Sequence, residues 1–319
     1  MCSGTEMRWA VVYGELRRWP PARGIGTFMR RLTPMEGRQE RPVAERTERT
    51  TVARHEHSAA GNVDLEGVPS IVERPHRLSM VYGGGGVFGI SYGAGVAQGL
   101  ARSGIPVASA PSLGTSAGAW VASAIMLGLT YDDFAGMQSP PLPTRRPVLY
   151  EAALSLFGDS MHHLVAASAI HLPSRRRHIL DGARYPLADL AAASSAVPGL
   201  FPPHRIEGRL YIDGGMWSAT SIDAAVDAQQ VIVVAPIAGR IMGPIGRTAG
   251  FLLARELQTW RHRHPGATIV VIRPNSAIAR LAGRHPLALF DAARARQVYP
   301  LAVAQGLQWG ERMQSATAA

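Results

Sequence analysis

The sequence predicts an α/β fold, a three-layer sandwich with a mainly parallel central sheet. Short apolar runs alternate with helical patterns rich in small residues, and glycine turns join the first strands to the helices that follow them. This order is typical of parallel sheets, because a helix carries the chain back to the start of the next strand. With 319 residues, 46% of them hydrophobic and 18% charged, the chain can form a large globular core.

From residue 77 onward, the sequence predicts the individual strands and helices. Apolar runs predict strands, and helical spacing predicts helices. The expected strands cover residues 77–82, 107–113, 209–213, 230–236 and 267–273, and the expected helices cover residues 89–103, 117–129, 148–157 and 286–313. Apart from the helix at 148–157, residues 138–192 show no clear pattern. This segment is a candidate lid, and we expect its arginine run at 175–177 to lie in a solvated loop.

The chain divides into three parts. Residues 1–77 are rich in Arg and Glu and lack apolar periodicity, so we expect a disordered tail. Residues 78–313 are expected to form the folded domain. Residues 314–319 are expected to be a flexible C-terminus.

Composition narrows the function classes. The net charge of +10 is carried by arginine alone, which we attribute to coding bias, so we expect no nucleic-acid partner. Cys2 is the single cysteine, which excludes an intramolecular disulfide and a zinc cluster. No stretch reaches the roughly 18–20 apolar residues of a spanning helix, and the N-terminus lacks a secretion signal. We expect a cytoplasmic protein that touches membranes peripherally, with residues 175–177 as candidate contacts.

A candidate nucleophile lies in the pentapeptide GTSAG at residues 114–118, between a predicted strand and a predicted helix. The pattern G-x-S-x-G in that context is typical of a nucleophile elbow, which exposes Ser116 at a helix N-terminus. The free amide of Ala117 would favour negative charge beside the hydroxyl. The alternative is a Ser/Gly turn that merely caps the helix.

A serine needs a base, and Asp213 is the candidate. It ends the strand RLYID and is followed by two glycines. Because it ends a strand, we expect it to point into the same crevice as Ser116, at the carboxyl edge of the sheet. The alternative is an Asp-Gly-Gly turn without a catalytic role.

A glycine-rich loop at residues 84–89, GGGVFG, fits the dinucleotide pattern G-x-G-x-x-G. Dinucleotide binding also needs an acidic residue about 20 positions later, and none occurs between Glu73 and Asp132. A phosphate-binding loop would need a lysine after the glycines, and there is none. Flexible amide donors at a helix start, one strand from a serine elbow, instead indicate an oxyanion hole.

These three motifs, in this order, resemble the patatin-like phospholipase family. A fourth segment supports the resemblance, since AASSAVPGLFPP at residues 192–203 is similar to the family's Ser-Ala-x-Pro-x-x-Phe-Pro segment before the catalytic aspartate. The resemblance implies a patatin-like catalytic domain over residues 78–313. It also implies hydrolysis of lipid or small-molecule acyl esters, of phospholipase A or esterase type, without metal or cofactor.

The resemblance also implies roles for individual residues. Ser116 would be the nucleophile and Asp213 its general base, in a dyad without histidine, with an acyl-enzyme intermediate on Ser116. Backbone amides of Gly85, Gly86 and Val87 would form the oxyanion hole. The remaining motif glycines are Gly84, Gly89, Gly114, Gly118, Gly214 and Gly215.

The sequence departs from the family pattern at two places. Phe88 stands where the family usually has Arg or Lys, and Met216 stands where it often has asparagine. Neither departure touches the nucleophile or the base. They bear on substrate preference, and the acyl chain, the headgroup and the oligomeric state stay open.

Three rival interpretations remain. A Ser-Asp-His triad could draw its histidine from His262, His264 or His285, which all follow Asp213 in the chain. We expect the first two to face solvent and the third to be structural. The second rival is a non-catalytic lipid-binding or regulatory protein of the same fold, and the third is a nucleotide-dependent reductase, disfavoured by the missing acid.

Overall fold

The computed structural model describes residues 76–318, except 137–141, 240–242 and 284. The expected disordered tail at 1–77 lies outside the described residues, save for the last two. The strands are β1 (His76–Tyr82), β2 (Ser112–Thr115), β3 (Val165–His171), β4 (Arg176–Asp181), β5 (His204–Ile206), β6 (Arg209–Asp213), β7 (Ala228–Val234) and β8 (Thr268–Ile272). The helices are α3 (Gly86–Arg102), α4 (Ala117–Met126), α5 (Tyr131–Ala135), α6 (Val148–Phe157), α7 (Leu187–Ser195), α8 (Pro244–Arg263), α9 (Ser276–Leu281) and α10 (Ala292–Ala318), with 3-10 turns η1 (Val107–Ser109), η2 (Gly214–Met216), η3 (Ile222–Ala224) and η4 (Pro286–Phe290).

The eight strands form one sheet, which is parallel at its centre. Its order is β5-β6-β3-β2-β1-β7-β8, and β4 pairs with β3 off this path. Strands β3, β2, β1, β7 and β8 are mutually parallel, whereas β4, β5 and β6 form antiparallel pairs. The expected α/β fold with a mainly parallel sheet is therefore confirmed.

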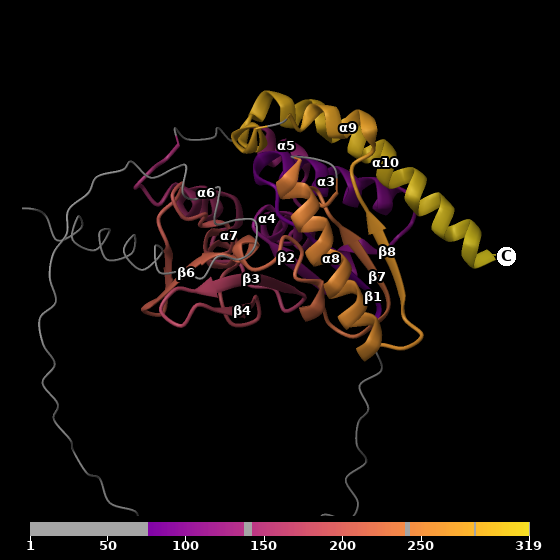
Figure 1. Ribbon diagram of the computed structural model, residues 1–319, viewed down its shortest axis with the longest axis horizontal. Coiled ribbons are helices and arrows are strands. Elements are labelled where there is room, and N and C mark those ends of the chain that lie inside the picture. The colour runs from indigo at the N-terminus through magenta and orange to yellow at the C-terminus, as the bar shows by residue number, and fades with distance from the viewer. Residues whose placement is uncertain (1–75, 137–141, 240–242, 284, 319) are drawn as a thin grey trace, which may run out of the picture.

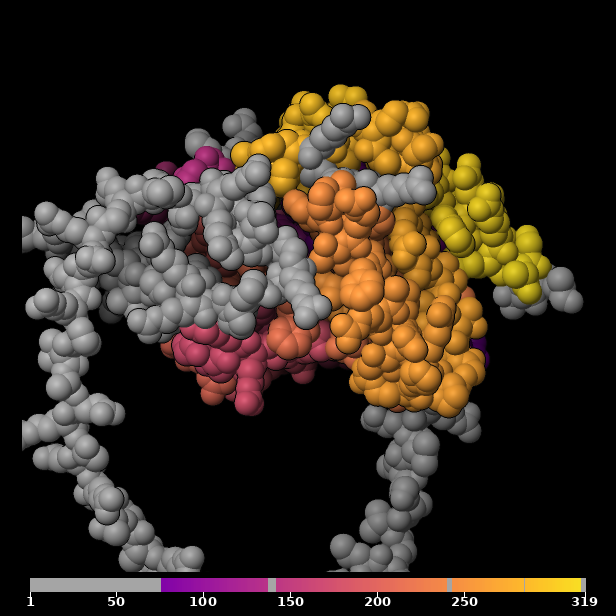
Figure 2. Space-filling model, in the orientation of Figure 1, coloured from indigo at the N-terminus to yellow at the C-terminus, as the bar shows by residue number. Residues whose placement is uncertain are grey.

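Helices cover both faces of the sheet (Figure 1). Along β1, Met80 and Tyr82 pack into the core under α3, α4 and α10, whereas Val81 points to the opposite face. There it joins a second core with Leu253 and Trp260 of α8. This alternation follows from the two-residue period of a strand, and it gives the three layers that the sequence predicts. In the space-filling view, α8 lies on the near face and α10 runs across the top (Figure 2).

Two strands meet end to end along β3. Strand β2 runs parallel to β3 and ends with Thr115 opposite Ser168. Strand β6 runs antiparallel to β3 and ends with Asp213 opposite Ala169. Because β4 occupies the other edge of β3 along residues 166–171, β2 and β6 must share one edge. Their carboxyl ends therefore face each other across a single register step.

Several predicted bounds need correction. The strand expected at 107–113 is the 3-10 turn η1 followed by the short strand β2, and helix α3 begins at Gly86 rather than at residue 89. The helix expected over 286–313 is the 3-10 turn η4 followed by α10. Residues 314–318, expected to be flexible, continue α10, and the Gln314 side chain donates a hydrogen bond to the Ser103 carbonyl.

Elements missing from the prediction are rich in alanine or polar residues. Strand β3 reads VAASAIH and helix α7 reads LADLAAASS, and neither carries the β-branched or amphipathic pattern that marks an element in a single sequence. Helix α8 did carry a signal, since Ala249, Leu253, Leu257 and Trp260 recur at helical spacing and are all buried.

The arginine run at 175–177 is not a solvated loop throughout. Arg176 and Arg177 belong to β4, and the Arg177 guanidinium makes two hydrogen bonds to the Asp223 carboxylate, of 2.6 and 2.7 Å. Arg177 also lies over the ring of Trp217. A bidentate ion pair that is partly buried leaves this arginine little freedom to contact a membrane. Among the described residues, no helix is both long and apolar enough to cross a membrane.

Candidate active site

Ser116 occupies the sharp turn between β2 and α4. Its backbone has φ 53° and ψ −122°, a positive-φ conformation that costs a residue with a side chain about 1–3 kcal/mol. Close packing enforces the turn: a Cβ on Gly118 would lie 1.8 Å from the Tyr82 carbonyl oxygen, so only glycine lets α4 approach β1 here. Gly114 lies in β2 on the other side of the turn. This is the geometry of a nucleophile elbow.

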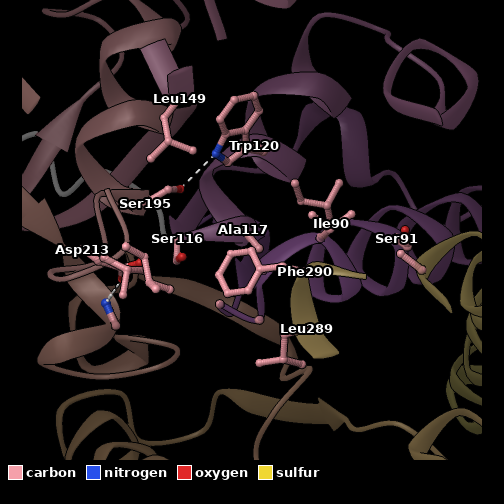
Figure 3. A pocket seen from close by; sticks show the side chains of 18 of the residues that line it. Ile90, Ser91, Ser116, Ala117, Trp120, Leu149, Ser195, Asp213, Leu289 and Phe290 are labelled. Atoms are coloured by element: carbon pink, nitrogen blue, oxygen red, sulfur yellow. Dashed lines mark hydrogen bonds between the residues drawn. The ribbon is translucent and has the colours of Figure 1, made fainter. Parts of the chain in front are cut away.

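Asp213 lies beside Ser116 at the end of β6 (Figure 3). Its side chain accepts a hydrogen bond from the Gly215 amide at 2.5 Å and interacts with the Ser116 hydroxyl. Asp213 is 4% exposed. Burial raises the pKa of Asp213 from 3.8 to about 6, against the two hydrogen bonds, which lower it. At neutral pH the carboxylate is mostly ionised, yet it is a stronger base than an exposed aspartate.

The glycine-rich loop lies against the elbow. A Cβ on Gly84 would lie 3.2 Å from the Ser116 Cβ. The Gly84 amide is engaged, since it donates to the Ala219 carbonyl at 2.8 Å. Within the described part of the chain, the amides of Gly85, Gly86 and Val87 have no backbone acceptor, as expected for the first turn of α3. These three donors are free to bind negative charge.

Ser116 and Asp213 line a cavity of about 460 Å³, together with the other side chains drawn in Figure 3. Its size lies within the range of small-molecule sites, roughly 300–1,000 Å³. Of the predicted residues, Gly84, Gly85, Gly86, Val87, Ser116, Asp213 and Gly215 line it, whereas Gly89, Gly114, Gly118 and Gly214 lie in the surrounding backbone. The remaining walls are mainly apolar and include Ile90, Trp120, Leu149, Leu289 and Phe290. Such walls suit a hydrocarbon chain.

Phe88 is not part of the cavity wall. It is 1% exposed and stacks on Tyr92 in the core, with the ring centroids 6.3 Å apart. The departure from the family pattern at this position therefore changes the packing under α3 and not the lining of the cavity. Met216, the second departure, does line it.

None of the three candidate histidines lines the described cavity. His262 is exposed, as expected. His264 is not free in solvent, which corrects the prediction: its Nε2 lies 2.6 Å from Asp227 and its ring stacks on Trp260. His285 has a structural role, as expected, because its Nδ1 accepts the Leu287 amide at the start of η4.

Sequence reasoning missed the polar residues that surround Ser116 and Asp213. Ser194 and Ser195 end α7, and their hydroxyls accept hydrogen bonds from the Ser116 amide at 2.8 Å and from Trp120 Nε1 at 2.9 Å. The available signal was the resemblance of residues 192–203 to a family segment, which indicates importance without a role. Within the described ranges, no three His, Cys, Asp or Glu side chains gather as a metal site would require.

Comparison with known proteins gives one family. The model of the patatin-like phospholipase family matches residues 157–226, a segment that contains Asp213 and not Ser116. Among solved structures, the chain is similar to VipD from Legionella pneumophila, at 14% identity and a TM-score of 0.38, covering 74% of this chain and 67% of that one. A search of curated proteins found no match. The family whose model matches residues 157–226 is the one that the four sequence motifs resemble.

Proposed function

We propose that this protein is a lipid acyl hydrolase that cleaves carboxylic esters through a dyad of Ser116 and Asp213. The observation that carries the proposal is the contact of the Ser116 hydroxyl with a buried carboxylate at the base of an apolar cavity. A serine becomes nucleophilic when a base accepts its proton, and Asp213 is the base within reach. The family match is consistent with lipid esters as substrates.

In the first half of the reaction, Ser116 Oγ attacks the ester carbonyl carbon while its proton passes to Asp213. The carbonyl oxygen becomes an oxyanion, which the amides of Gly85, Gly86 and Val87 stabilise. The tetrahedral intermediate then collapses. The alcohol leaves with the proton held by Asp213, and the acyl group stays on Ser116.

In the second half, water releases the acyl group. Asp213 accepts a proton from a water molecule, whose oxygen attacks the acyl carbon and forms a second oxyanion at the same amides. Collapse breaks the bond to Ser116, and the proton returns from Asp213 to Ser116 Oγ. The products are a carboxylic acid and an alcohol, and both residues end in their starting states.

A fluorophosphonate probe tests the nucleophile directly, because it phosphonylates an activated serine. We expect labelling of the parent protein, and none of Ser116→Ala or Asp213→Ala. Ser123→Ala is the matched control, since Ser123 is a buried serine of the same helix α4 and does not line the cavity. Labelling of Ser116→Ala at the parental level would contradict the assignment.

Hydrolysis of p-nitrophenyl esters of increasing chain length tests the substrate class. We expect kcat/KM to rise with chain length, because each added methylene buried in the cavity contributes about 0.8 kcal/mol. A protein that binds these esters without releasing p-nitrophenol would instead be a non-catalytic lipid-binding protein.

A further inference from the structure

The end of α7 contacts both members of the dyad through hydrogen bonds. The Ser116 amide donates to Ser194 Oγ at 2.8 Å, and the Asp213 amide donates to the Ala196 carbonyl at 3.1 Å. Ser195, between Ser194 and Ala196 in the chain, accepts a hydrogen bond from the indole N–H of Trp120. Trp120 lies one turn into α4, the helix that follows Ser116. Residues 194–196 therefore make hydrogen bonds to the ends of both β2 and β6, which meet along β3.

Ser194 is itself fixed in place. Its hydroxyl donates to the Ser168 carbonyl at 2.6 Å, so the same oxygen joins the elbow to β3. Ser168 also accepts, through its own hydroxyl, a hydrogen bond of 3.0 Å from Ser221, in the segment that follows Asp213. Ser168, Ser194 and Ser221 are all fully buried. Because these groups are shielded from bulk water, the loss of one partner leaves another buried polar group unsatisfied.

Helix α7 gives this network a stiff support. Leu187, Leu190 and Ala191 are fully buried in the core on its inner side. Catalytic groups need to be held within about 0.5 Å of their productive positions, and rigid elements do so better than loops. A serine at positive φ depends on such support, because its backbone would relax toward a commoner conformation without it.

We propose that residues 194–196 act as a clamp that sets the position of Ser116 relative to Asp213, and that Ser194 is the positioning residue for the nucleophile. The inference rests on the proposed function. It assigns a physical role to the segment AASSAVPGLFPP, whose resemblance to a family motif came without one. Ser194 does not line the cavity, so it acts through Ser116 and not on the substrate.

Ser194→Ala tests the clamp, with Ser79→Ala as the matched control. Ser79 is a buried serine of β1 whose hydroxyl donates to the Pro111 carbonyl, and it does not line the cavity. We expect both variants to unfold at a lower temperature than the parent. Only Ser194→Ala should lose kcat per titrated active site, on the order of 10- to 100-fold, with KM unchanged, because misplaced reacting groups slow the chemical step.

Two further variants keep the test decisive. Ser194→Thr retains the oxygen acceptor and should recover most of the lost kcat. If Ser194→Ala does not fold, Ser194→Cys takes its place, because sulfur is a weak acceptor of nearly the same shape. A kcat per titrated site equal to that of the parent, in Ser194→Ala or in Ser194→Cys, overturns the inference.

Amide hydrogen exchange separates failure of the clamp from failure of the proposed function. Peptides that contain residues 113–119 should exchange faster in Ser194→Ala than in the parent, and not in Ser79→Ala, whether or not the protein hydrolyses esters. Equal exchange overturns the clamp. If Ser194→Ala shows the faster exchange but the parent neither hydrolyses esters nor labels with fluorophosphonate, the proposed function is overturned and the clamp is not.

Discussion

Thr115 and Asp213 end two strands that approach each other from opposite directions and pair with consecutive residues of β3, Ser168 and Ala169. Ser116 follows Thr115 directly, so the proposed nucleophile and the proposed base, Asp213, meet where the two strands end. The sequence placed both at the carboxyl edge of a parallel sheet. The structure brings them together by a different route, since β6 is antiparallel to its neighbour β3.

Hydrolysis should depend on pH through Asp213. Only the ionised carboxylate can accept the Ser116 proton, and the pKa of Asp213 is raised to about 6 by burial. We therefore expect kcat/KM to rise with pH through about 6 and to level off above it. Initial rates on a neutral ester between pH 4.5 and 8.5 measure this limb. A limb centred near pH 4 would show that the carboxylate is not desolvated.

Asp213→Asn should abolish turnover and stabilise the fold at neutral pH. Because the folded pKa is higher than the unfolded one, the parent loses stability as pH rises from about 4 to 6, by up to about 3 kcal/mol, and keeps that loss above pH 6. The variant cannot ionise there and escapes the loss. The unfolding temperature of the variant should exceed that of the parent by a small amount at pH 4 and by the largest amount at pH 7. A difference in unfolding temperature that does not change with pH would contradict the raised pKa of Asp213.

Gly86→Ala should damage the oxyanion loop. Gly86 has φ 58°, and an added Cβ would lie 2.8 Å from the Leu289 carbonyl oxygen, so the loop must shift. Since one lost oxyanion donor costs about 10²- to 10³-fold in kcat, we expect a loss of this order. Gly128→Ala is the control. Gly128 has φ 68°, but a Cβ added there meets nothing within 4 Å, so this variant carries the backbone strain without the clash. Similar kcat values for the two variants would argue against a role of the glycine-rich loop in stabilising the oxyanion.

Histidine substitutions should leave the chemistry intact. His262→Ala and His285→Ala should keep the parental kcat/KM. His264→Ala should lower the unfolding temperature without changing kcat per titrated site, because it breaks the hydrogen bond to Asp227 and the stacking on Trp260. Loss of all turnover on any one of these changes would establish a triad instead of a dyad.

Arg296 offers a test of headgroup preference. Among the described residues that line the cavity, it is the one cation, and it is exposed on α10. Arg296→Gln should lower kcat/KM a few-fold for a phosphatidylglycerol, because an exposed ion pair contributes roughly 0.2–1 kcal/mol. The kcat/KM for a diacylglycerol with the same acyl chains should not change. Arg294→Gln is the control, because Arg294 pairs with Asp291 and does not line the cavity. Equal effects on both lipids would rule out recognition of the phosphate.

The sequence by itself determined the local motifs on which the proposed chemistry depends. The elbow around Ser116, the glycines before α3 and the pair Asp213-Gly214 are local patterns, because a tight turn or a free amide depends on a few consecutive residues. The parallel core was also readable, since β1, β7 and β8 are apolar runs with clear ends. The alanine-rich β3 and α7 were not, because small residues carry little preference for helix or strand position.

The tertiary structure alone decided how these patterns work together. It showed that Phe88 belongs to the core, that Arg177 is held by Asp223, and that Asp213 is buried deeply enough for its pKa to rise. It also showed that Ser194, 78 residues from Ser116, accepts a hydrogen bond from the Ser116 amide. Burial and hydrogen bonds between distant segments depend on which surfaces pack together, and a single sequence carries no local mark of that packing.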